Sequence, residues 1–277
     1  MKRAAHTPQI AIFDSGVGGL TVASAIHQLL PWCDLRYLGD TARLPYGTKS
    51  ASTVLRYALQ VADALVTDAG TIDALVVACN TASACALPAL RARHPFPVLG
   101  VIEPGADRAV ATTRSGHIGV IGTERTIASA AYAQAIASRD PKITVHGLAT
   151  PLLVALAEEG WFDHPVTDAT LDAYLGPFLA DPQVAQIDTL VLGCTHYPVF
   201  KAALGRALGR ILDHEVTLVD SAEAIAQEVA KLLAAAGHAA VRPGRIALYA
   251  TDVGERFERV GRYFLPLSDV PICAIDL

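Results

Sequence analysis

Residues 73–81 read DALVVACNT and residues 188–196 read DTLVLGCTH, and the two stretches share one pattern. Each is a run of apolar, β-prone residues that ends in a cysteine followed by two polar residues. Such runs are typical of buried strands in parallel sheets, and ligands of open parallel sheets bind beyond the carboxyl ends of the strands. The repeat therefore predicts two related halves, each with one cysteine, Cys79 or Cys194, at the ligand-binding edge of its sheet.

A weaker repeat precedes each cysteine. Residues 12–16 (IFDSG) and 120–124 (VIGTE) both lead from a strand-like run into a polar turn, and in each half the cysteine follows after a similar interval. Alternating strand-like and helix-like segments predict parallel sheets flanked by helices. Further strands are expected at 35–38, 98–102, 143–148, 216–219 and 245–250, and helices at 20–30, after Ser50, at 127–137 and at 152–158.

The expected fold class is α/β, with two pseudo-symmetric domains whose parallel sheets are flanked by helices, and with the active site in the interdomain cleft. Two facing halves would place Cys79 and Cys194 on opposite sides of that cleft. The last strands could return to complete the sheet of the first half. The first domain is therefore predicted to be discontinuous, formed by residues 1–98 and 213–277, and the second to span residues 99–212.

The composition of the chain restricts the class of function. Its 277 residues are 52% apolar and carry a net charge of −5, which gives no reason to expect a nucleic-acid partner. No apolar run is long enough to span a membrane, and the run at 10–13 is too short for the core of a signal peptide. The five cysteines are odd in number and irregularly spaced, so a disulfide framework is not expected. We therefore predict a cytoplasmic protein without a membrane partner.

The glycine-rich turn after the first strand, DSGVGG at 14–19, has two interpretations. Its backbone N–H groups, at the N-terminus of a helix, could bind a carboxylate, or it could be an ordinary strand-to-helix turn. The glycine spacing matches neither the dinucleotide-binding motif nor the phosphate-binding Walker A motif. Likewise, PYG at 45–47 is equally well interpreted as a plain turn, and EEG at 158–160 as a solvated helix end.

Cys79 and Cys194 could each be an ordinary buried thiol, but their repeated position at strand ends favours a shared chemical role. His196 stands two residues after Cys194, a spacing that provides no clustered set of metal ligands, so no metal site is predicted. A nucleophilic Cys194–His196 pair of the hydrolase type would leave Cys79 unexplained. The other cysteines are interpreted as structural or surface thiols: Cys33, Cys85 and Cys273.

Together these motifs resemble those of glutamate racemases, and they follow the family's order. The matching segments are IAIFDSGVGG at 10–19, GDTARLPYG at 39–47, VVACNTAS at 76–83, IGVIGT at 118–123, LAEEG at 156–160 and VLGCTHYP at 191–198. Aspartate and hydantoin racemases share the two-cysteine plan and are the main alternative, but DSGVGG, PYG and GCTHYP in combination favour the glutamate type. A non-catalytic binding protein with the same cleft is the alternative of a different class, and it would need no cysteine on each wall.

The resemblance implies an isomerase that interconverts L- and D-glutamate and supplies D-glutamate for peptidoglycan. It also implies that neither pyridoxal phosphate nor a metal is needed, and that the protein forms a homodimer. By this resemblance Cys79 removes the α-proton of D-glutamate and Cys194 that of L-glutamate, while Asp14, His196 and Glu158 are auxiliary acidic or basic groups. The positions that match the family's substrate-binding residues are Asp14, Ser15, Pro45, Tyr46, Gly47, Asn80, Thr81, Thr123, Thr195 and His196.

Two cysteines suit this reaction because inversion of an α-carbon requires a base on one face and an acid on the other. The reverse reaction exchanges their roles, so one cysteine must be a thiolate while the other is a thiol. A free cysteine has a pKa of about 8.5, so only ~3% is thiolate at pH 7, and a pKa of about 7 raises this to ~50%. We therefore expect the surroundings of the two cysteines to stabilise a thiolate.

Overall fold

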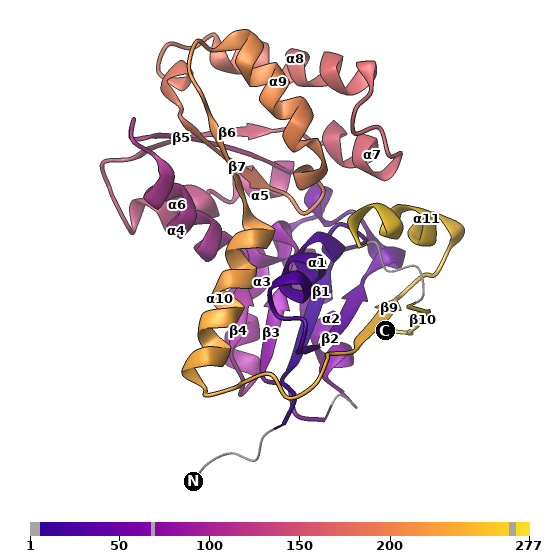
Figure 1. Cartoon of the computed structure of the whole chain (residues 1–277). Helices are drawn as coiled ribbons and strands as arrows, with labels where there is room; N and C mark the ends of the chain where they lie inside the picture. The colour runs from indigo at the N-terminus through magenta and orange to yellow at the C-terminus, as the bar shows by residue number, and fades with distance from the viewer. Residues whose placement is uncertain (1–5, 68–69, 266–269) are drawn as a thin grey trace. The chain divides into compact units, whose positions relative to one another are not determined.

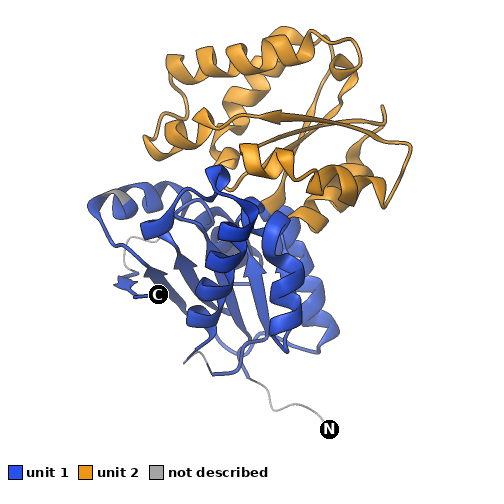
Figure 2. Ribbon diagram, turned by 180° about the vertical axis from the view of Figure 1, so that it is seen from behind, with its two compact units in different colours: residues 1–101, 222–277 blue, residues 102–221 orange. Residues whose placement is uncertain are grey.

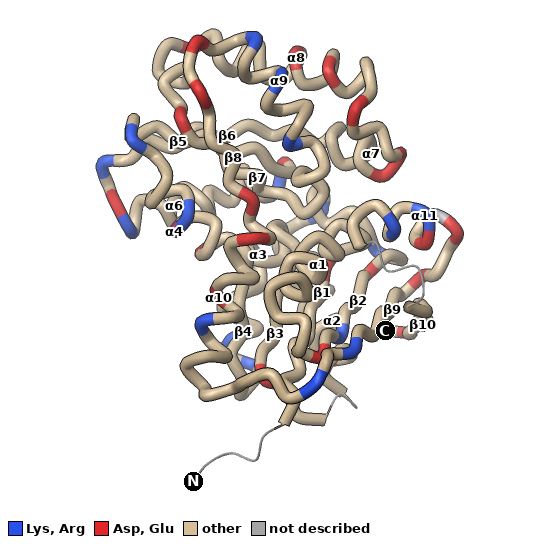
Figure 3. The backbone as a smooth tube through the Cα atoms, viewed as in Figure 1, with Lys and Arg blue, Asp and Glu red and all other residues tan. Residues whose placement is uncertain are grey.

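The chain divides into two compact units in the computed structural model, which describes residues 6–67, 70–265 and 270–277 (Figure 2). Unit 1 comprises Met1–Val101 and Ala222–Leu277, and unit 2 comprises Ile102–Ser221. Residues 1–5, which begin the segment considered as a signal peptide, lie outside the described residues. No helix in the described ranges is long and apolar enough to cross a membrane. Figure 3 shows basic and acidic positions interspersed in both units.

Unit 1 is built on a six-stranded sheet with the order β10-β9-β2-β1-β3-β4, in which all neighbours pair in parallel (Figure 1). Its strands are β1 (Gln9–Asp14), β2 (Asp34–Gly39), β3 (Ala74–Val77), β4 (Val98–Gly100), β9 (Ile246–Ala250) and β10 (Ile272–Ala274). Its helices are α1 (Leu20–Leu29), α2 (Ala51–Val66), α3 (Asn80–Arg93), α10 (Ser221–Ala235), α11 (Glu255–Phe264) and the 3-10 helices η1 (Thr41–Arg43) and η2 (Tyr46–Thr48).

Unit 2 is built on a four-stranded parallel sheet with the order β6-β5-β7-β8. Its strands are β5 (His117–Gly122), β6 (Thr144–Ala149), β7 (Thr189–Gly193) and β8 (Thr217–Asp220). Its helices are α4 (Ile102–Thr112), α5 (Glu124–Ala128), α6 (Ala131–Ala137), α7 (Leu152–Glu158), α8 (Pro165–Leu179), α9 (Lys201–Ile211) and the 3-10 helices η3 (Val184–Gln186) and η4 (Tyr197–Phe200).

The two sheets repeat one topology. The order β2-β1-β3-β4 in unit 1 matches β6-β5-β7-β8 in unit 2, and in both units the first strand along the chain lies between the second and the third. The α/β class with parallel sheets flanked by helices is therefore confirmed, and the two stretches that end in Cys79 and Cys194 occupy equivalent strands, β3 and β7.

Two expectations from the sequence are wrong in detail. The strand predicted at 216–219 does not join the sheet of unit 1, because β8 pairs with β7 in unit 2 from Thr189↔Thr217 to Leu192↔Asp220. Helix α9 lies between β7 and β8 along the chain, which is the usual connection between neighbouring parallel strands. The strand predicted at 245–250 does return to the first sheet, where β9 pairs with β2. Strand β10 was not predicted.

The helix predicted at 127–137 is interrupted. Ala130 has a left-handed backbone with φ 54°, between α5 and α6. The Ser129 hydroxyl donates to the Thr126 carbonyl oxygen at 2.6 Å and accepts from the Ala131 N–H at 3.2 Å. A serine that bonds to nearby backbone groups in this way competes with the helical hydrogen bonds, and neither glycine nor proline marks the break in the sequence.

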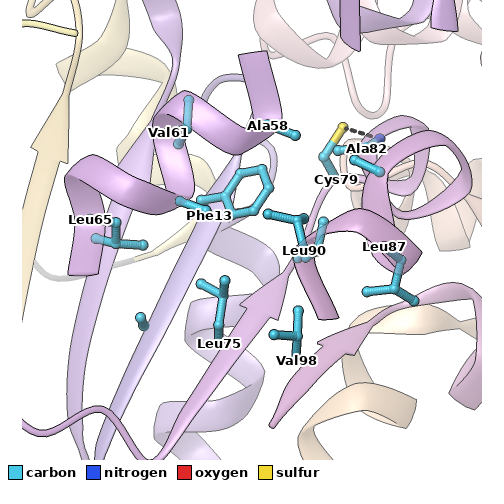
Figure 4. Packing of buried hydrophobic residues seen from close by; sticks show 14 of the residues in the cluster. Phe13, Ala58, Val61, Leu65, Leu75, Cys79, Ala82, Leu87, Leu90 and Val98 are labelled. Atoms are coloured by element: carbon cyan, nitrogen blue, oxygen red, sulfur yellow. Dashed lines mark hydrogen bonds between the residues drawn. The ribbon is translucent and has the colours of Figure 1, made fainter. Parts of the chain in front are cut away.

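One face of the unit 1 sheet packs against α2 and α3. Val54, Ala58, Val61 and Leu65 recur at helical spacing along α2 and are all buried. Figure 4 shows these helices meeting Phe13 of β1 and Leu75 of β3, and Cys79 belongs to the same cluster. Burial of each large side chain contributes roughly 1.5–3 kcal/mol. The backbone around Cys79 is therefore supported by a closely packed core.

Unit 2 is stabilised at the amino ends of its strands by Asp188. Its carboxylate accepts hydrogen bonds at 2.7 Å from the Thr113 hydroxyl and from the Arg114 and Ser115 N–H groups. Partial burial alone would raise the pKa of Asp188, but these bonds and one from Thr189 lower it to about 2. The charged carboxylate thus ties the loop before β5 to the start of β7.

We expect Asp188→Asn to lower the free energy of unfolding by ~1–3 kcal/mol, because an amide N–H₂ would face backbone donors. The folded pKa of Asp188 lies below the ordinary value of 3.8, so its stabilisation is present above that pH and is lost as the pH falls through about 2. Urea unfolding followed by circular dichroism measures the change. Asp213→Asn, at a fully exposed carboxylate, is the control. Equal stability of Asp188→Asn and wild type would contradict this role.

Candidate active site

In unit 1, Asp14 and Cys79 come together because their strands are neighbours. Strand β1 ends at Asp14, β3 ends two residues before Cys79, and the parallel register aligns Phe13 with Val77. The Ala78 N–H continues this pairing beyond β3 and donates to the Phe13 carbonyl oxygen at 2.9 Å. Both side chains are buried, Asp14 completely and Cys79 with 5% exposed. The carboxyl edge of the sheet thus carries a carboxyl group and a thiol at the ends of two neighbouring strands, with Ser15 opposite Cys79 by register.

The sulfur of Cys79 lies at the N-terminus of α3 and caps it. It accepts the Ala82 N–H at 3.4 Å, the bond drawn in Figure 4, and its own S–H donates to the Ser15 hydroxyl at 3.5 Å. A helix N-terminus and backbone N–H donors both stabilise a thiolate. Asn80 and Thr81 are the first residues of this helix and are almost completely buried.

The turn that carries Asp14 and Ser15 is held tightly. The Gly16 N–H donates to Asp14 Oδ2 at 3.0 Å, and the Tyr37 hydroxyl donates to the Gly16 carbonyl oxygen at 2.7 Å. A Cβ atom at Gly19 would lie 2.4 Å from Cβ of Asp14, so this position requires glycine. Burial, with the nearby charges of Asp14 and Cys79, raises the pKa of Tyr37 well above its usual value. Tyr37 therefore stays a neutral donor.

Tyr46 is anchored by a residue that the sequence analysis did not single out. Its hydroxyl donates to Asp40, which is completely buried and also accepts from Arg43 Nε at 2.8 Å and from the Thr251 hydroxyl at 3.0 Å. Burial and the Asp40 charge raise the pKa of Tyr46. Asp40 directly follows β2, so it stands at the same kind of strand end as the residues that were noted. It fixes the segment that contains Pro45 and Gly47.

Unit 2 has an equivalent edge. Strand β7 ends directly before Cys194, and its neighbour β5 ends directly before Thr123, which caps α5 by accepting the Thr126 N–H. Cys194, Thr195 and His196 are each 6% exposed. By register, Thr123 is placed relative to Cys194 as Ser15 is relative to Cys79.

Tyr197 holds the segment after Cys194 in place by hydrogen bonds. Its N–H donates to the Cys194 carbonyl oxygen at 3.1 Å. Its buried hydroxyl donates to the Thr150 carbonyl oxygen at 2.8 Å and accepts from the Thr150 hydroxyl at 3.0 Å. These bonds tie the end of β7 to the residue that follows β6, so the cysteine is positioned by two strand ends.

His196 lies between a thiol and a carboxylate. Its Nδ1 is 3.8 Å from the Cys194 sulfur, and its Nε2 is 3.2 Å from Glu158 Oε1. Burial alone would lower the pKa of His196, but the hydrogen bonds and charges of Cys194 and Glu158 outweigh it and raise the pKa to about 10. The imidazole is therefore protonated at neutral pH, with one ring nitrogen facing the sulfur and the other facing the carboxylate.

Glu158 reaches His196 because α7 ends there. The Gly160 N–H donates to the Ala157 carbonyl oxygen at 3.1 Å and the Trp161 N–H to the Leu156 carbonyl oxygen at 3.0 Å, the pattern of a Schellman motif. Gly160 has φ 75°, which favours glycine. The Glu158 side chain is 14% exposed and turned to His196, whereas its neighbour Glu159 is exposed.

The remaining cysteines differ from these two. All five are free thiols, as expected from their irregular spacing. Cys33 is buried, and burial together with the charges of Asp34 and Asp73 raises its pKa to about 12, so it stays neutral. Cys85 is half-buried in α3 and Cys273 is exposed in β10. Only Cys79 and Cys194 stand where a parallel strand of each unit gives way to a polar turn.

Comparisons with known proteins agree with one another. Residues 21–229 match the family described as Asp/Glu/Hydantoin racemase. A glutamate racemase of Geobacter metallireducens is 53% identical over 267 residues, which cover 94% of each chain. The crystal structure of a glutamate racemase from Bacillus anthracis is similar, with a TM-score of 0.89, 36% identity and 99% of each chain covered. That of Francisella tularensis glutamate racemase in complex with D-glutamate has a TM-score of 0.87, 32% identity and 98% of each chain covered.

We expect NMR of ¹⁵N-labelled histidine rings to show His196 doubly protonated at neutral pH, losing its proton only as the pH rises through about 10. Glu158→Gln should lower this midpoint by about one unit or more, because it removes the anionic partner. Glu159→Gln, which changes the adjacent exposed carboxylate, is the matched control and should leave the midpoint in place. An imidazole of His196 that is already neutral at pH 8 in the wild type would contradict the assignment.

Proposed function

Since the chain belongs to the Asp/Glu/Hydantoin racemase family, and within it to the glutamate racemases, we propose that it interconverts L- and D-glutamate with Cys79 and Cys194 as the two acid–base groups. The observation that carries the proposal is the repeated site: each unit ends its equivalent strand, β3 or β7, in a nearly buried cysteine with hydrogen-bonding neighbours. Neither a hydrolase pair nor a simple binding protein requires both.

In the direction from L- to D-glutamate, the Cys194 thiolate takes the α-proton from one face of the α-carbon. The Cys79 thiol gives its proton to the opposite face, so the carbon is inverted without net proton uptake. Cys194 is then a thiol and Cys79 a thiolate, which is the state that accepts D-glutamate and runs the reaction backwards. Exchange of protons with solvent restores the form that accepts L-glutamate.

The neighbours of each cysteine support this exchange of roles. The protonated His196, held by Glu158, stabilises the anionic form of Cys194. The Ala82 N–H and the N-terminus of α3 do the same for Cys79, and the Asp14 carboxyl group beside it is an auxiliary acid or base. Each thiolate thus has a stabilising partner within its own unit.

The α-proton of an amino acid is very weakly acidic, so binding of the substrate must also stabilise the carbanion-like transition state. We assign this role to hydrogen bonds from Ser15, Asn80, Thr81, Thr123 and Thr195 and from nearby backbone N–H groups. We also assign Tyr46, with Pro45 and Gly47 beside it, to the substrate-binding residues of unit 1. Its anchor to the buried Asp40 keeps its ring in place.

We propose that the protein acts in the cytoplasm, as a homodimer, and that its D-glutamate is incorporated into peptidoglycan. Light scattering on the purified chain tests the dimer, and rescue of a D-glutamate-requiring bacterium by the gene tests the supply of D-glutamate.

Cys79→Ser and Cys194→Ser should each lower racemisation in both directions by about 10³-fold or more, because a serine hydroxyl is not an anionic base at neutral pH. A glutamate analogue with a leaving group on the β-carbon needs only one deprotonation. Cys194→Ser should therefore still eliminate the leaving group from the D-analogue. Cys79→Ser should still eliminate it from the L-analogue. Circular dichroism of glutamate and absorbance of the elimination product measure the two reactions. Cys273→Ser, at an exposed thiol, is the control and should remain active.

The outcomes separate the alternatives. Full racemase activity in either variant would contradict the two-base mechanism, and reversed enantiomer preferences would contradict only the assignment of faces. Turnover of aspartate or a hydantoin in place of glutamate would identify a different racemase on the same fold. A hydrolytic activity that Cys194→Ser abolishes and Cys79→Ser retains would indicate a Cys–His hydrolase.

A further inference from the structure

Three side chains from distant parts of the sequence meet at the amino ends of the unit 1 strands, the edge opposite to Cys79. His6 precedes β1, Asp73 precedes β3, and His238 follows α10. His6 Nε2 lies 3.1 Å from each Asp73 oxygen, and His238 Nε2 lies 3.4 Å from Oδ1. Among the described residues, this is the one group of three or more His, Cys, Asp or Glu side chains whose donor atoms all lie within 4.8 Å of one another.

We propose that His6, Asp73 and His238 form a structural binding site for a divalent transition metal, with Zn²⁺ as the preferred ion. Two imidazole nitrogens and one carboxylate oxygen are a usual set of zinc ligands. With metal–ligand bonds of 2.0–2.1 Å, two ligands of a tetrahedral site lie ~3.3 Å apart. The two N–O separations in this cluster already have that length.

The carboxylate at the centre of the cluster is held in place for this role. Asp73 is 4% exposed, and its Oδ2 accepts the Gln9 N–H at 2.9 Å, which leaves Oδ1 facing both imidazoles. Hydrogen bonds of this kind orient the ligands of a metal. Asp188, at the equivalent position of unit 2, has instead hydroxyl and backbone N–H donors from the loop before β5. Histidine partners are thus found at Asp73 of the first repeat and not at the equivalent Asp188 of the second.

His238 is positioned by the end of α10. The Gly237 N–H donates to the Ala234 carbonyl oxygen and the His238 N–H to the Leu233 carbonyl oxygen, both at 3.0 Å. The chain therefore turns at the end of α10 and directs His238 toward Asp73, where its side chain is only 7% exposed. One ion would connect the segment before β1, the start of β3 and the end of α10.

A cavity of about 550 Å³ lies directly beside the cluster, and both Asp73 and His238 line it. Ile72, Phe96 and Leu233 form part of its apolar wall. This space provides an entry path for the ion and room for a water molecule in the fourth position of a tetrahedral site. The site is remote from the cysteines of the reaction, so racemisation does not depend on it.

The test uses the full-length chain without an affinity tag, reduced and freed of metal by a chelator, at pH 7.5. Competition with a chromophoric chelator should show that His6→Gln and His238→Gln each weaken the binding of one Zn²⁺ at least tenfold. Saturating Zn²⁺ should raise the melting temperature of the wild type but not of these variants. His6 is 35% exposed, so His6→Gln folds even if the more buried variant does not. His27→Gln, in α1 of the same unit, is the matched control and should bind like the wild type.

Co²⁺ distinguishes this site from the thiols. The Co²⁺ ion that the wild type binds and the histidine variants do not should show only weak visible bands. It should lack the intense near-ultraviolet absorption that arises when cobalt binds a thiolate. Equal Zn²⁺ affinity in His6→Gln, His238→Gln and wild type would overturn the proposal. The proposal would also be overturned if the Co²⁺ ion lost in the histidine variants showed the thiolate absorption band. In either case His6, Asp73 and His238 would be a hydrogen-bonded cluster only, and the racemase proposal would stand unchanged.

Discussion

The parallel pairing of β1 with β3, and of β5 with β7, is the constraint on which both half-sites depend. Parallel strands end at one edge of a sheet, so residues that follow neighbouring strands must lie side by side. The register Phe13↔Val77 brings Ser15 to Cys79, with Asp14 one residue before it, and Ile121↔Leu192 brings Thr123 to Cys194. Other features of the site, such as the cap of α3 and the Schellman end of α7, supply partners to the cysteines that this pairing has placed.

The two half-sites share a topology but differ in electrostatics. The sulfur of Cys79 has neutral hydrogen-bonding partners, Ser15 and the Ala82 N–H, and a buried carboxyl group nearby. Cys194 has an imidazolium whose charge is maintained by Glu158. A reversible inversion requires that neither cysteine is permanently the acid or the base. Different partners, each able to hydrogen-bond to the sulfur, meet that requirement while keeping the two thiols chemically alike.

Much of the fold could be predicted from the sequence because parallel sheets leave a clear pattern, an apolar run that ends in a polar turn. That pattern identified β1, β3, β5 and β7 and the residues that follow them. It did not identify Asp40, whose partners Tyr46 and Thr251 are set by tertiary structure. The sheet to which β8 belongs depends on its pairing partner, which its own residues do not specify. The break at Ala130 depends on hydrogen bonds of a serine hydroxyl. His6, Asp73 and His238 are too far apart in the sequence for any spacing rule to connect them.

Racemisation of a single enantiomer in D₂O tests the two-base account most directly. Starting from pure L-glutamate, the account predicts that the first D-glutamate formed carries deuterium at the α-carbon, while the remaining L-glutamate keeps its proton. The same pattern must hold from D-glutamate, with the enantiomers exchanged. This follows because one cysteine removes the proton and the other, exchanged with solvent, delivers a deuteron from the opposite face. Early product that retains the original α-proton would show a single base acting on both faces and would contradict the roles given to Cys79 and Cys194.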